Sequence, residues 1–169
     1  MNPTATIRNE RADDIPSIRA VVHAAFGSAG EADLVEGLRR SSALTLSAVA
    51  VVGSRVVGHV AFSPVTIGGS HLALALAPVA VAPDCQRQGI GSALIRWGLE
   101  ECRRLEHGVV IVVGEPAYYP WFGFTPASPF GIQCPFPVPP EAFMVLELSP
   151  GAASGCRGMV RYRPEFDSV

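Results

Sequence analysis

The residues best suited to bind an anion lie together in the stretch Gln86–Gly91, which reads Gln-Arg-Gln-Gly-Ile-Gly. Glycines at positions 89 and 91 carry no Cβ atom that would hold a phosphate at a distance. Arg87 adds a fixed positive charge, and Gln86 and Gln88 add neutral donors. If a helix begins here, its first backbone N–H groups lack partners and its dipole favours negative charge. The stretch therefore predicts a phosphate site, although an ordinary strand-to-helix connection could have the same two glycines.

Two other phosphate motifs do not fit this stretch. A P-loop ends in Gly-Lys-Ser/Thr, and no lysine precedes Ser92. A dinucleotide fingerprint that starts at Gly89 needs Gly or Ala at position 94, which is Leu94. That fingerprint also places its first glycine directly after the strand, whereas five residues separate Pro83 from Gly89.

The flanking residues predict the strand and the helix that position the site. Residues 72–82 are almost wholly apolar, which favours a buried strand, although Ala and Leu alone also form helices. Pro83-Asp84 closes this run as a turn. From about Gly89 to Glu106 the spacing predicts a helix, with an i,i+4 pair between Glu100 and Arg104 and a C-terminal cap at Gly108. Its apolar face is expected to hold Gly91, Leu94, Ile95, Gly98, Cys102 and Leu105.

The spacing Gln86-x-x-Gly89-x-Gly91 between a strand and a long helix resembles the signature of the GNAT superfamily of acyl-CoA-dependent N-acyltransferases. Residues 30–35, residues 58–65 and the proline-rich part resemble its YhbS-like branch. The resemblance implies acetyl-CoA as acyl donor and no metal, with loop amides on the pyrophosphate and the preceding strand on the pantetheine arm. Pro78, which cannot donate to a sheet ladder, fits the entry point of that arm. The implied cofactor-binding residues are Val79, Ala80, Val81, Gln86, Arg87, Gln88, Gly89, Ile90, Gly91, Ser92 and Tyr119.

A second resemblance to the family lies in residues 114–124, which contain Tyr-x-x-x-Gly-Phe. It implies that Tyr119 is the general acid that protonates the departing thiolate of coenzyme A. Pro120 departs from the charged residue usual in the family and Tyr118 replaces its leucine, so Tyr118 remains an alternative. The aromatic residues that follow are better explained as a cluster that closes the core.

The resemblance also implies the other catalytic groups. The oxyanion donor would be a backbone N–H of the central strand, that of Val79. The glutamate that the family often places on or near this strand is missing, because residues 72–82 contain no acid. Glu31 and Glu115 are the available carboxylates for a base that acts through water. His59 is a third candidate, although a histidine inside a strand is more often structural.

The remaining segments predict the rest of the fold. Six prolines among residues 125–140 stiffen a loop, which is either a surface connection, a wall over the acceptor pocket or a dimer contact. The order of elements implies an α/β (α+β) GNAT fold, with a mixed central sheet, splayed fourth and fifth strands and flanking helices. The expected segments are a strand Thr4–Asn9, a helix from about Glu31 to Arg40, a hairpin Leu44–Val52 and Arg55–Phe62, and strands Val109–Val113, Ala142–Leu148 and Arg157–Tyr162. A further helix is expected after a cap at Asp13 or Asp14, with a break at Gly27 and with Ile15, Ile18, Val22 and Phe26 on its inward face.

Composition limits the classes of function that remain. The 169 residues are enough for one domain, expected to span 1–169, and 49% of them are hydrophobic. A net charge of −2 supplies no basic field for nucleic acid, and no apolar run reaches membrane-spanning length. The four cysteines show neither metal-ligand spacing nor a secreted disulfide framework, so a reduced cytoplasm is expected.

The function implied is acetyl transfer from acetyl-CoA to an amine of an unidentified acceptor, by a monomer or homodimer without nucleic acid or membrane partners. Two alternatives stay open. One is a catalytically degenerate GNAT domain that binds acyl-CoA as a sensor or interaction module. The other is a nucleotide-binding or scaffold domain with no role for coenzyme A.

Overall fold

Two long strands and one long helix organise the chain: β3 (Arg55–Ile67), β4 (His71–Val81) and α3 (Ile90–Arg104). The structure is a computed structural model that describes residues 4–169. Its contacts divide the chain into two units, and each of these three elements runs through both. Unit 1 consists of residues 4–63, 77–98 and 164–169, and unit 2 of residues 64–76 and 99–163.

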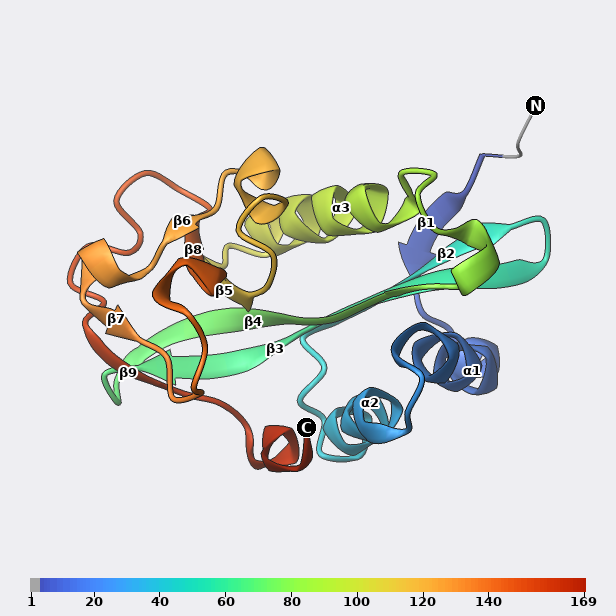
Figure 1. The fold of residues 1–169 in the computed structure, drawn as a ribbon, viewed down its shortest axis with the longest axis horizontal. Coiled ribbons are helices and arrows are strands. Elements are labelled where there is room, and N and C mark those ends of the chain that lie inside the picture. Colours follow the sequence, from blue (N-terminus) through green and yellow to red (C-terminus); the bar gives the residue numbers. More distant parts are fainter. Residues whose placement is uncertain (1–3) are drawn as a thin grey trace. The chain divides into compact units, whose positions relative to one another are not determined.

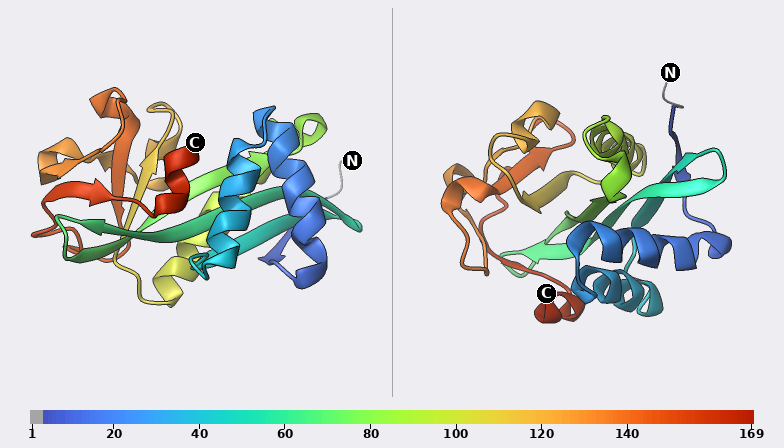
Figure 2. Two further views of the ribbon diagram at one scale, coloured as in Figure 1. Left: turned by 90° about the horizontal axis from the view of Figure 1, so that it is seen from below. Right: turned by 45° about the vertical axis from the view of Figure 1, so that its right-hand side comes forward.

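In unit 1, helices cover both faces of a sheet (Figures 1 and 2). The strands β1 (Thr6–Asn9) and β2 (Leu46–Val52) pair antiparallel with each other, and β2 pairs antiparallel with β3. The helices α1 (Ile15–Phe26) and α2 (Gly30–Arg40) lie side by side on one face, and α3 lies on the other (Figure 1). The unit also contains three short 3-10 helices, η1 (Ala12–Asp14), η2 (Pro83–Cys85) and η6 (Pro164–Ser168).

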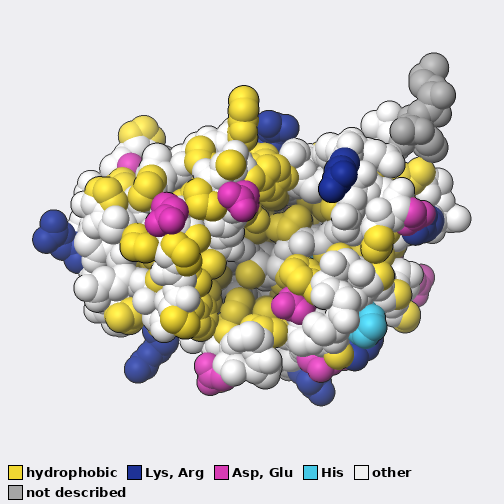
Figure 3. Space-filling view, viewed as in Figure 1, with side chains coloured by type: hydrophobic (Ala, Val, Ile, Leu, Met, Phe, Trp, Pro, Cys, Tyr) yellow, Lys and Arg dark blue, Asp and Glu magenta, His cyan; other side chains and the backbone are white. Residues whose placement is uncertain are grey.

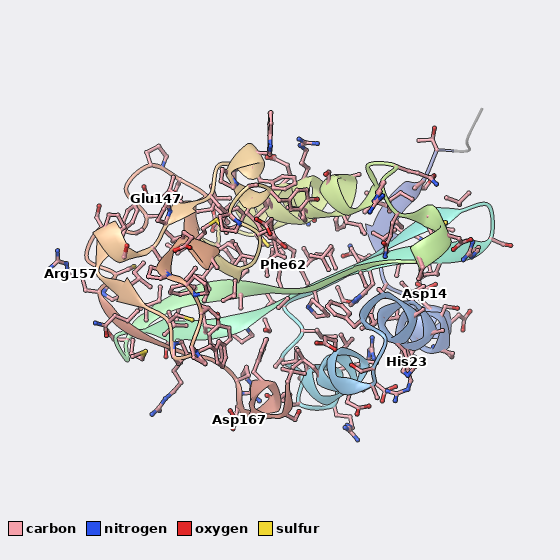
Figure 4. The ribbon with its side chains drawn as sticks, in the orientation of Figure 1. Asp14, His23, Phe62, Glu147, Arg157 and Asp167 are labelled. Carbon is pink, nitrogen blue, oxygen red and sulfur yellow. The ribbon has the colours of Figure 1, made fainter. Side chains whose placement is uncertain are left out.

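The helical spacing of apolar residues explains how α1 and α2 pack. Each helix has a buried face, so burying both against the sheet removes apolar surface from water. The cluster that results contains Ile18, Val21, Val22, Ala32, Val35, Val49 and Ala80. On the opposite face of β3, a glycine in α3 permits close packing, because a Cβ at Gly98 would lie 2.5 Å from the Phe62 ring. Figure 4 labels Phe62, whose side chain lies between β3 and α3.

Unit 2 contains the remaining strands and the proline-rich loop. The strand β5 (Val109–Val113) pairs antiparallel with β8 (Phe143–Glu147) along its full length. The short strand β6 (Thr125–Pro126) pairs antiparallel with β8 on its other side. The strand β9 (Gly158–Arg161) pairs with the end of β3 and, in parallel, with β7 (Ile132–Gln133). Three further 3-10 helices are η3 (Tyr119–Phe122), η4 (Ser128–Phe130) and η5 (Pro140–Ala142).

The parallel contact of β4 with β5 is short. It consists of Leu74 opposite Val110 and Ala75 opposite Ile111, although β4 has 11 residues and β5 has five. The two strands therefore separate beyond Ala75 and Ile111, which confirms the expected splay. The mixed α/β fold class and the order of the main elements are also as the sequence predicts.

Three local expectations were wrong. The helix α3 ends at Arg104, and Glu106 rather than Gly108 takes the left-handed conformation, with a φ of 65°. The N–H groups of Glu106 and His107 satisfy the last carbonyls of the helix, those of Arg103 and Cys102. Ion pairs in α3 join Glu100 to Arg103 and Glu101 to Arg104, at i,i+3 instead of i,i+4. Leu105 and Phe26, expected to face inward, are 44% and 43% exposed.

Charged side chains of both signs are scattered over the face shown in Figure 3, without a large patch of one sign. All 13 basic side chains of the chain are arginines, because the sequence contains no lysine. Among the described residues, no helix combines the length and apolar character needed to cross a bilayer.

Candidate active site

The connection between β4 and α3 has the backbone geometry of an anion-binding loop. Arg87 and Gly89 are both left-handed, with φ values of 62° and 85°. Left-handed residues that alternate with ordinary ones turn successive N–H groups toward one side, which makes a concave site for an anion. The first helical bond runs from the N–H of Ala93 to the carbonyl of Gly89, so the N–H groups of Ile90 and Gly91 lack an intrahelical carbonyl. Residues 86–89 are exposed, so an anion can reach them.

A cavity of about 440 Å³ opens beside this loop within unit 1. Its volume lies in the range that is usual for small-molecule sites. A Cβ placed on Gly89 would meet no atom within 4 Å, so the space above this residue is open. The sequence motif does not predict that Thr4 and Ala5 of the N-terminal segment line this cavity. The cavity is lined by Thr4, Ala5, Arg87, Gln88, Gly89, Ile90 and Ala93.

The Gln86 side chain makes a contact within the protein that the sequence does not predict. Its side-chain Nε2 donates to the backbone carbonyl of Val81 at 3.0 Å, so this amide ties the loop to the end of β4. Arg87, whose side chain is exposed at the cavity, supplies a positive charge to the site. In the second half of β4, Ala80 is buried while Val79 and Val81 are half-buried.

Unit 2 places Tyr119 in an aromatic cluster on the η3 turn. Its ring makes edge-on contacts with Tyr118 and Phe124, at centroid distances of 5.2 and 5.7 Å. Gly114, which follows β5, makes room for it, since a Cβ there would lie 2.2 Å from the Tyr119 ring. Burial, with a smaller contribution from Tyr118, raises the pKa of Tyr119 to about 12, so this phenol keeps its proton at neutral pH. The ring of Tyr119 thus packs in the aromatic cluster, and its hydroxyl is protonated at neutral pH.

The two candidate carboxylates lie in different surroundings. Glu115 is exposed in unit 2, and its backbone carbonyl accepts the N–H groups of Tyr118 and Tyr119 at 3.0 and 3.3 Å. Glu31 lies in the first turn of α2 in unit 1, with its Oε2 3.5 Å from the Ser28 hydroxyl. The structure therefore brings Glu115 close to Tyr119 and puts Glu31 on a helix of the other unit.

His59 belongs to a buried polar network in unit 1. Its Nε2 lies 2.8 Å from the Ser47 hydroxyl, which in turn bonds Glu10, and Arg39 holds Glu10 at 2.9 and 3.0 Å. Burial lowers the pKa of His59 to about 4, so the ring is neutral at pH 7. Burial alone would raise the pKa of Glu10, but the hydrogen bonds from Arg39 and Ser47 lower it. A fully buried histidine in such a network fits the structural role that strand histidines usually have.

The described residues contain no group of three or more His, Cys, Asp or Glu side chains placed to hold a metal ion. The four cysteines are free thiols. The features available for chemistry are the anion-binding loop with its cavity and Glu31 in unit 1, and the Tyr119 cluster with Glu115 in unit 2.

This fold, with its anion-binding loop between β4 and α3, defines a known class of transferase. Residues 6–127 match the model of the acetyltransferase (GNAT) domain, and the chain belongs to this family. It is 37% identical over 163 residues to the uncharacterized N-acetyltransferase YhbS of Escherichia coli K12, which covers 95% of this chain and 98% of that one. The uncharacterized N-acetyltransferase YjhQ of the same organism is 41% identical over 134 residues, 76% of this chain and 74% of its own.

Two solved structures extend the likeness to three dimensions. The crystal structure of YhbS from Escherichia coli in complex with CoA has a TM-score of 0.94 at 36% identity and covers 99% of this chain and 94% of that one. A GNAT family acetyltransferase from Brucella melitensis, in complex with acetyl-CoA, has a TM-score of 0.82 at 37% identity and covers 96% and 98%.

Proposed function

We propose that this protein is an N-acetyltransferase that transfers an acetyl group from acetyl-CoA to an amine of a small molecule or protein. The observation that carries the proposal is the exposed loop of Arg87 and Gly89, in left-handed conformation beside a cavity at the start of α3. Membership in the GNAT family supports it, as do the CoA and acetyl-CoA complexes of the two similar structures.

The residues of the loop suit the diphosphate of coenzyme A. Backbone amides from Gln88 to Ser92 would hold its oxygens, and Arg87 would add a positive charge. Polar backbone groups of Val79, Ala80 and Val81 would bind the pantetheine arm. The bound thioester supplies an activated acyl group, so the protein has only to position it, stabilise the developing oxyanion and manage protons.

For the transfer itself, we assign three roles. The N–H of Val79 stabilises the oxyanion while the amine nitrogen forms its bond to the carbonyl carbon. As the carbon–sulfur bond breaks, Tyr119, which is protonated at neutral pH, gives its proton to the thiolate. The proton that the amine loses goes through water to a carboxylate, Glu115 or Glu31, and Glu115 has the better support because it lies on the same turn as Tyr119.

One observation favours a second candidate, an acyl-CoA sensor without turnover. The strand β4, His71–Val81, contains no acidic residue that could act as a base. An acceptor screen that detects free thiol separates the two, because a sensor binds acetyl-CoA but releases no coenzyme A with any amine.

The placement of the diphosphate is tested by Gly91→Glu, which puts a carboxylate and a Cβ into the loop. We expect calorimetry to show no binding of acetyl-CoA while circular dichroism stays that of the parent. Ser154→Glu adds the same charge at an exposed position of unit 2 and should bind normally. Unchanged affinity in Gly91→Glu would show that the diphosphate binds elsewhere.

We further propose that the chain acts as one domain in the cytoplasm, as a monomer or homodimer, without nucleic acid or membrane partners. Three shared elements support the single domain, and four free thiols support a reducing compartment. The mixed charges of Figure 3 offer no basic surface for nucleic acid on the face shown.

A further inference from the structure

An ion pair joins the η2 turn, which directly precedes the anion-binding loop, to the start of β3. Arg55, the first residue of β3, reaches Asp84 of the η2 turn with two hydrogen bonds, Nη1 to Oδ2 and Nη2 to Oδ1, both 2.8 Å long. The two residues are 29 positions apart in the sequence and come from different elements. Two parallel bonds between a planar guanidinium and a carboxylate fix orientation as well as distance.

Other contacts tie the same turn to the same strand. The N–H of Ala82 donates to the carbonyl of Val57 in β3 at 2.8 Å, and the Arg55 Nη1 also lies 3.7 Å from the Cys85 sulfur. The turn is therefore held against β3 just before Gln86, where the anion-binding loop begins.

The pair has little to contribute to global stability. Both side chains are largely exposed, 55% for Arg55 and 64% for Asp84, and exposed pairs contribute little. Its position has a clearer consequence for an anionic ligand. Asp84 would repel a diphosphate bound a few residues away, and Arg55 neutralises that charge while it fixes the turn.

We propose that the Arg55–Asp84 pair is a positioning element for the diphosphate-binding loop: it sets the turn from which the loop leaves and masks a carboxylate beside the anion site. This inference rests on the proposed binding of the coenzyme A diphosphate at residues 86–92. Neither residue needs to touch the ligand.

The test measures the affinity of the single variants Arg55→Ala and Asp84→Ala and of the double variant for two probes. One probe is acetyl-CoA, and the other is acetyl-pantetheine, which lacks the diphosphate. We expect each variant to raise the Kd for acetyl-CoA by about threefold to tenfold, with the double variant no worse than the singles. Affinity for acetyl-pantetheine and the thermal midpoint should stay those of the parent.

Asp84→Ala decides between positioning and charge. If charge alone mattered, loss of this carboxylate would tighten acetyl-CoA binding, whereas loss of positioning weakens it. The reversed pair, Arg55→Asp with Asp84→Arg, should restore part of the affinity. With an active acceptor, KM for acetyl-CoA should rise while kcat at saturation is unchanged.

Arg104→Ala is the control, because it removes another surface ion pair of an exposed arginine, with the half-buried Glu101 at 2.8 Å, and should leave the Kd unchanged. Parental affinity in Asp84→Ala, or an equal loss for both probes, overturns the inference. If Gly91→Glu also binds acetyl-CoA normally, the proposed placement of the diphosphate at residues 86–92 is wrong. If Gly91→Glu abolishes binding and Asp84→Ala does not weaken it, only the role of the ion pair is wrong.

Discussion

Tyr119 is the residue on which the proposed chemistry depends most directly. Tyr119→Phe keeps the ring contacts with Tyr118 and Phe124 and removes only the hydroxyl. We expect turnover to fall by roughly 10²–10⁴-fold, the usual effect of one acid–base group. Binding of acetyl-CoA, measured by calorimetry, should barely change, because the proposed phosphate contacts lie in another part of the chain.

Two variants control this prediction. Tyr118→Phe should be mild, and a reversed order of severity would mean that Tyr118 is the acid. Gly114→Ala keeps the hydroxyl but pushes a methyl group into the Tyr119 ring, so it should slow turnover without removing any titratable group. Turnover at the parental rate in both tyrosine variants would assign the cluster to packing alone.

His59 shows how a hydrogen-bond network fixes a protonation state. The Ser47 hydroxyl has one hydrogen and donates it to Glu10, so the Nε2 of His59 must donate to Ser47. That tautomer leaves Nδ1 as an acceptor, and this buried atom has no hydrogen-bond partner among the described residues. A charged imidazolium would place a second buried proton there, which the surroundings do not accommodate.

The lowered pKa of His59 predicts a loss of stability in mild acid. The unfolded chain binds a proton near the ordinary pKa of 6.5, whereas the folded chain binds it only near 4, so the free energy of unfolding falls as pH drops between these values. The loss from this group should approach about 3 kcal/mol between pH 7 and pH 4. Urea unfolding of the parent and of His59→Gln measures it, and the variant should lose less. Parallel pH dependences would mean that His59 is not the group responsible.

At the scale of elements, the packing of α3 on β3 depends on a glycine. A Cβ at Gly98 would lie 2.5 and 2.9 Å from two atoms of the fully buried Phe62 ring, which has little freedom to move. We expect Gly98→Ala to lower the free energy of unfolding by about 1–3 kcal/mol in urea titrations.

Gly37 in α2 provides the control for this change. An added methyl there meets the Cγ of Glu165 at 3.2 Å, the flexible part of a half-buried side chain. Gly37→Ala should be neutral or should stabilise by up to about 1 kcal/mol, because alanine is the better helix former. Equal effects of both changes would show that α3 can shift away from Phe62.

The elements themselves were largely predictable, because their signals are local. The apolar run of β5 gave its bounds, Val109–Val113, without error, and the hydrophobic spacing of α3 gave its length within about two residues at each end. The prediction for the C-terminus of α3 was wrong because Glu106 takes the left-handed conformation, which a glycine such as Gly108 adopts more easily. Sequence alone does not reveal which residue accepts that strain, since tertiary contacts decide it.

The only part of the candidate site that could be predicted from the sequence is the part formed by one short, continuous motif. The loop from Gln86 to Gly91 is such a motif, and the structure gives it an anion-binding geometry. The contact of Gln86 with Val81, the wall formed by Thr4 and Ala5, and the Arg55–Asp84 pair were missed. Each depends on the fold bringing polar groups of common types together, for which spacing carries no signal.

At the scale of the whole molecule, the three elements shared by the units predict cooperative unfolding. Each unit contains one tryptophan, Trp97 in unit 1 and Trp121 in unit 2. Fluorescence of the single-tryptophan variants Trp121→Phe and Trp97→Phe therefore reports each unit separately. We expect coincident midpoints in urea, after allowance for the stability of each variant, because β3, β4 and α3 cannot unfold in one unit without losing continuity in the other. Two separated transitions would indicate two domains.

The absence of lysine among the 13 basic residues has a consequence for a protein that handles a reactive thioester. Acetyl-CoA acylates exposed ε-amines slowly without catalysis, and this chain presents none, since guanidinium groups stay protonated and are poor nucleophiles. The sequence therefore offers no lysine for such slow acetylation, and in an assay with intact-mass detection an acetyl group on an added amine is not confused with acetylated lysine of this chain.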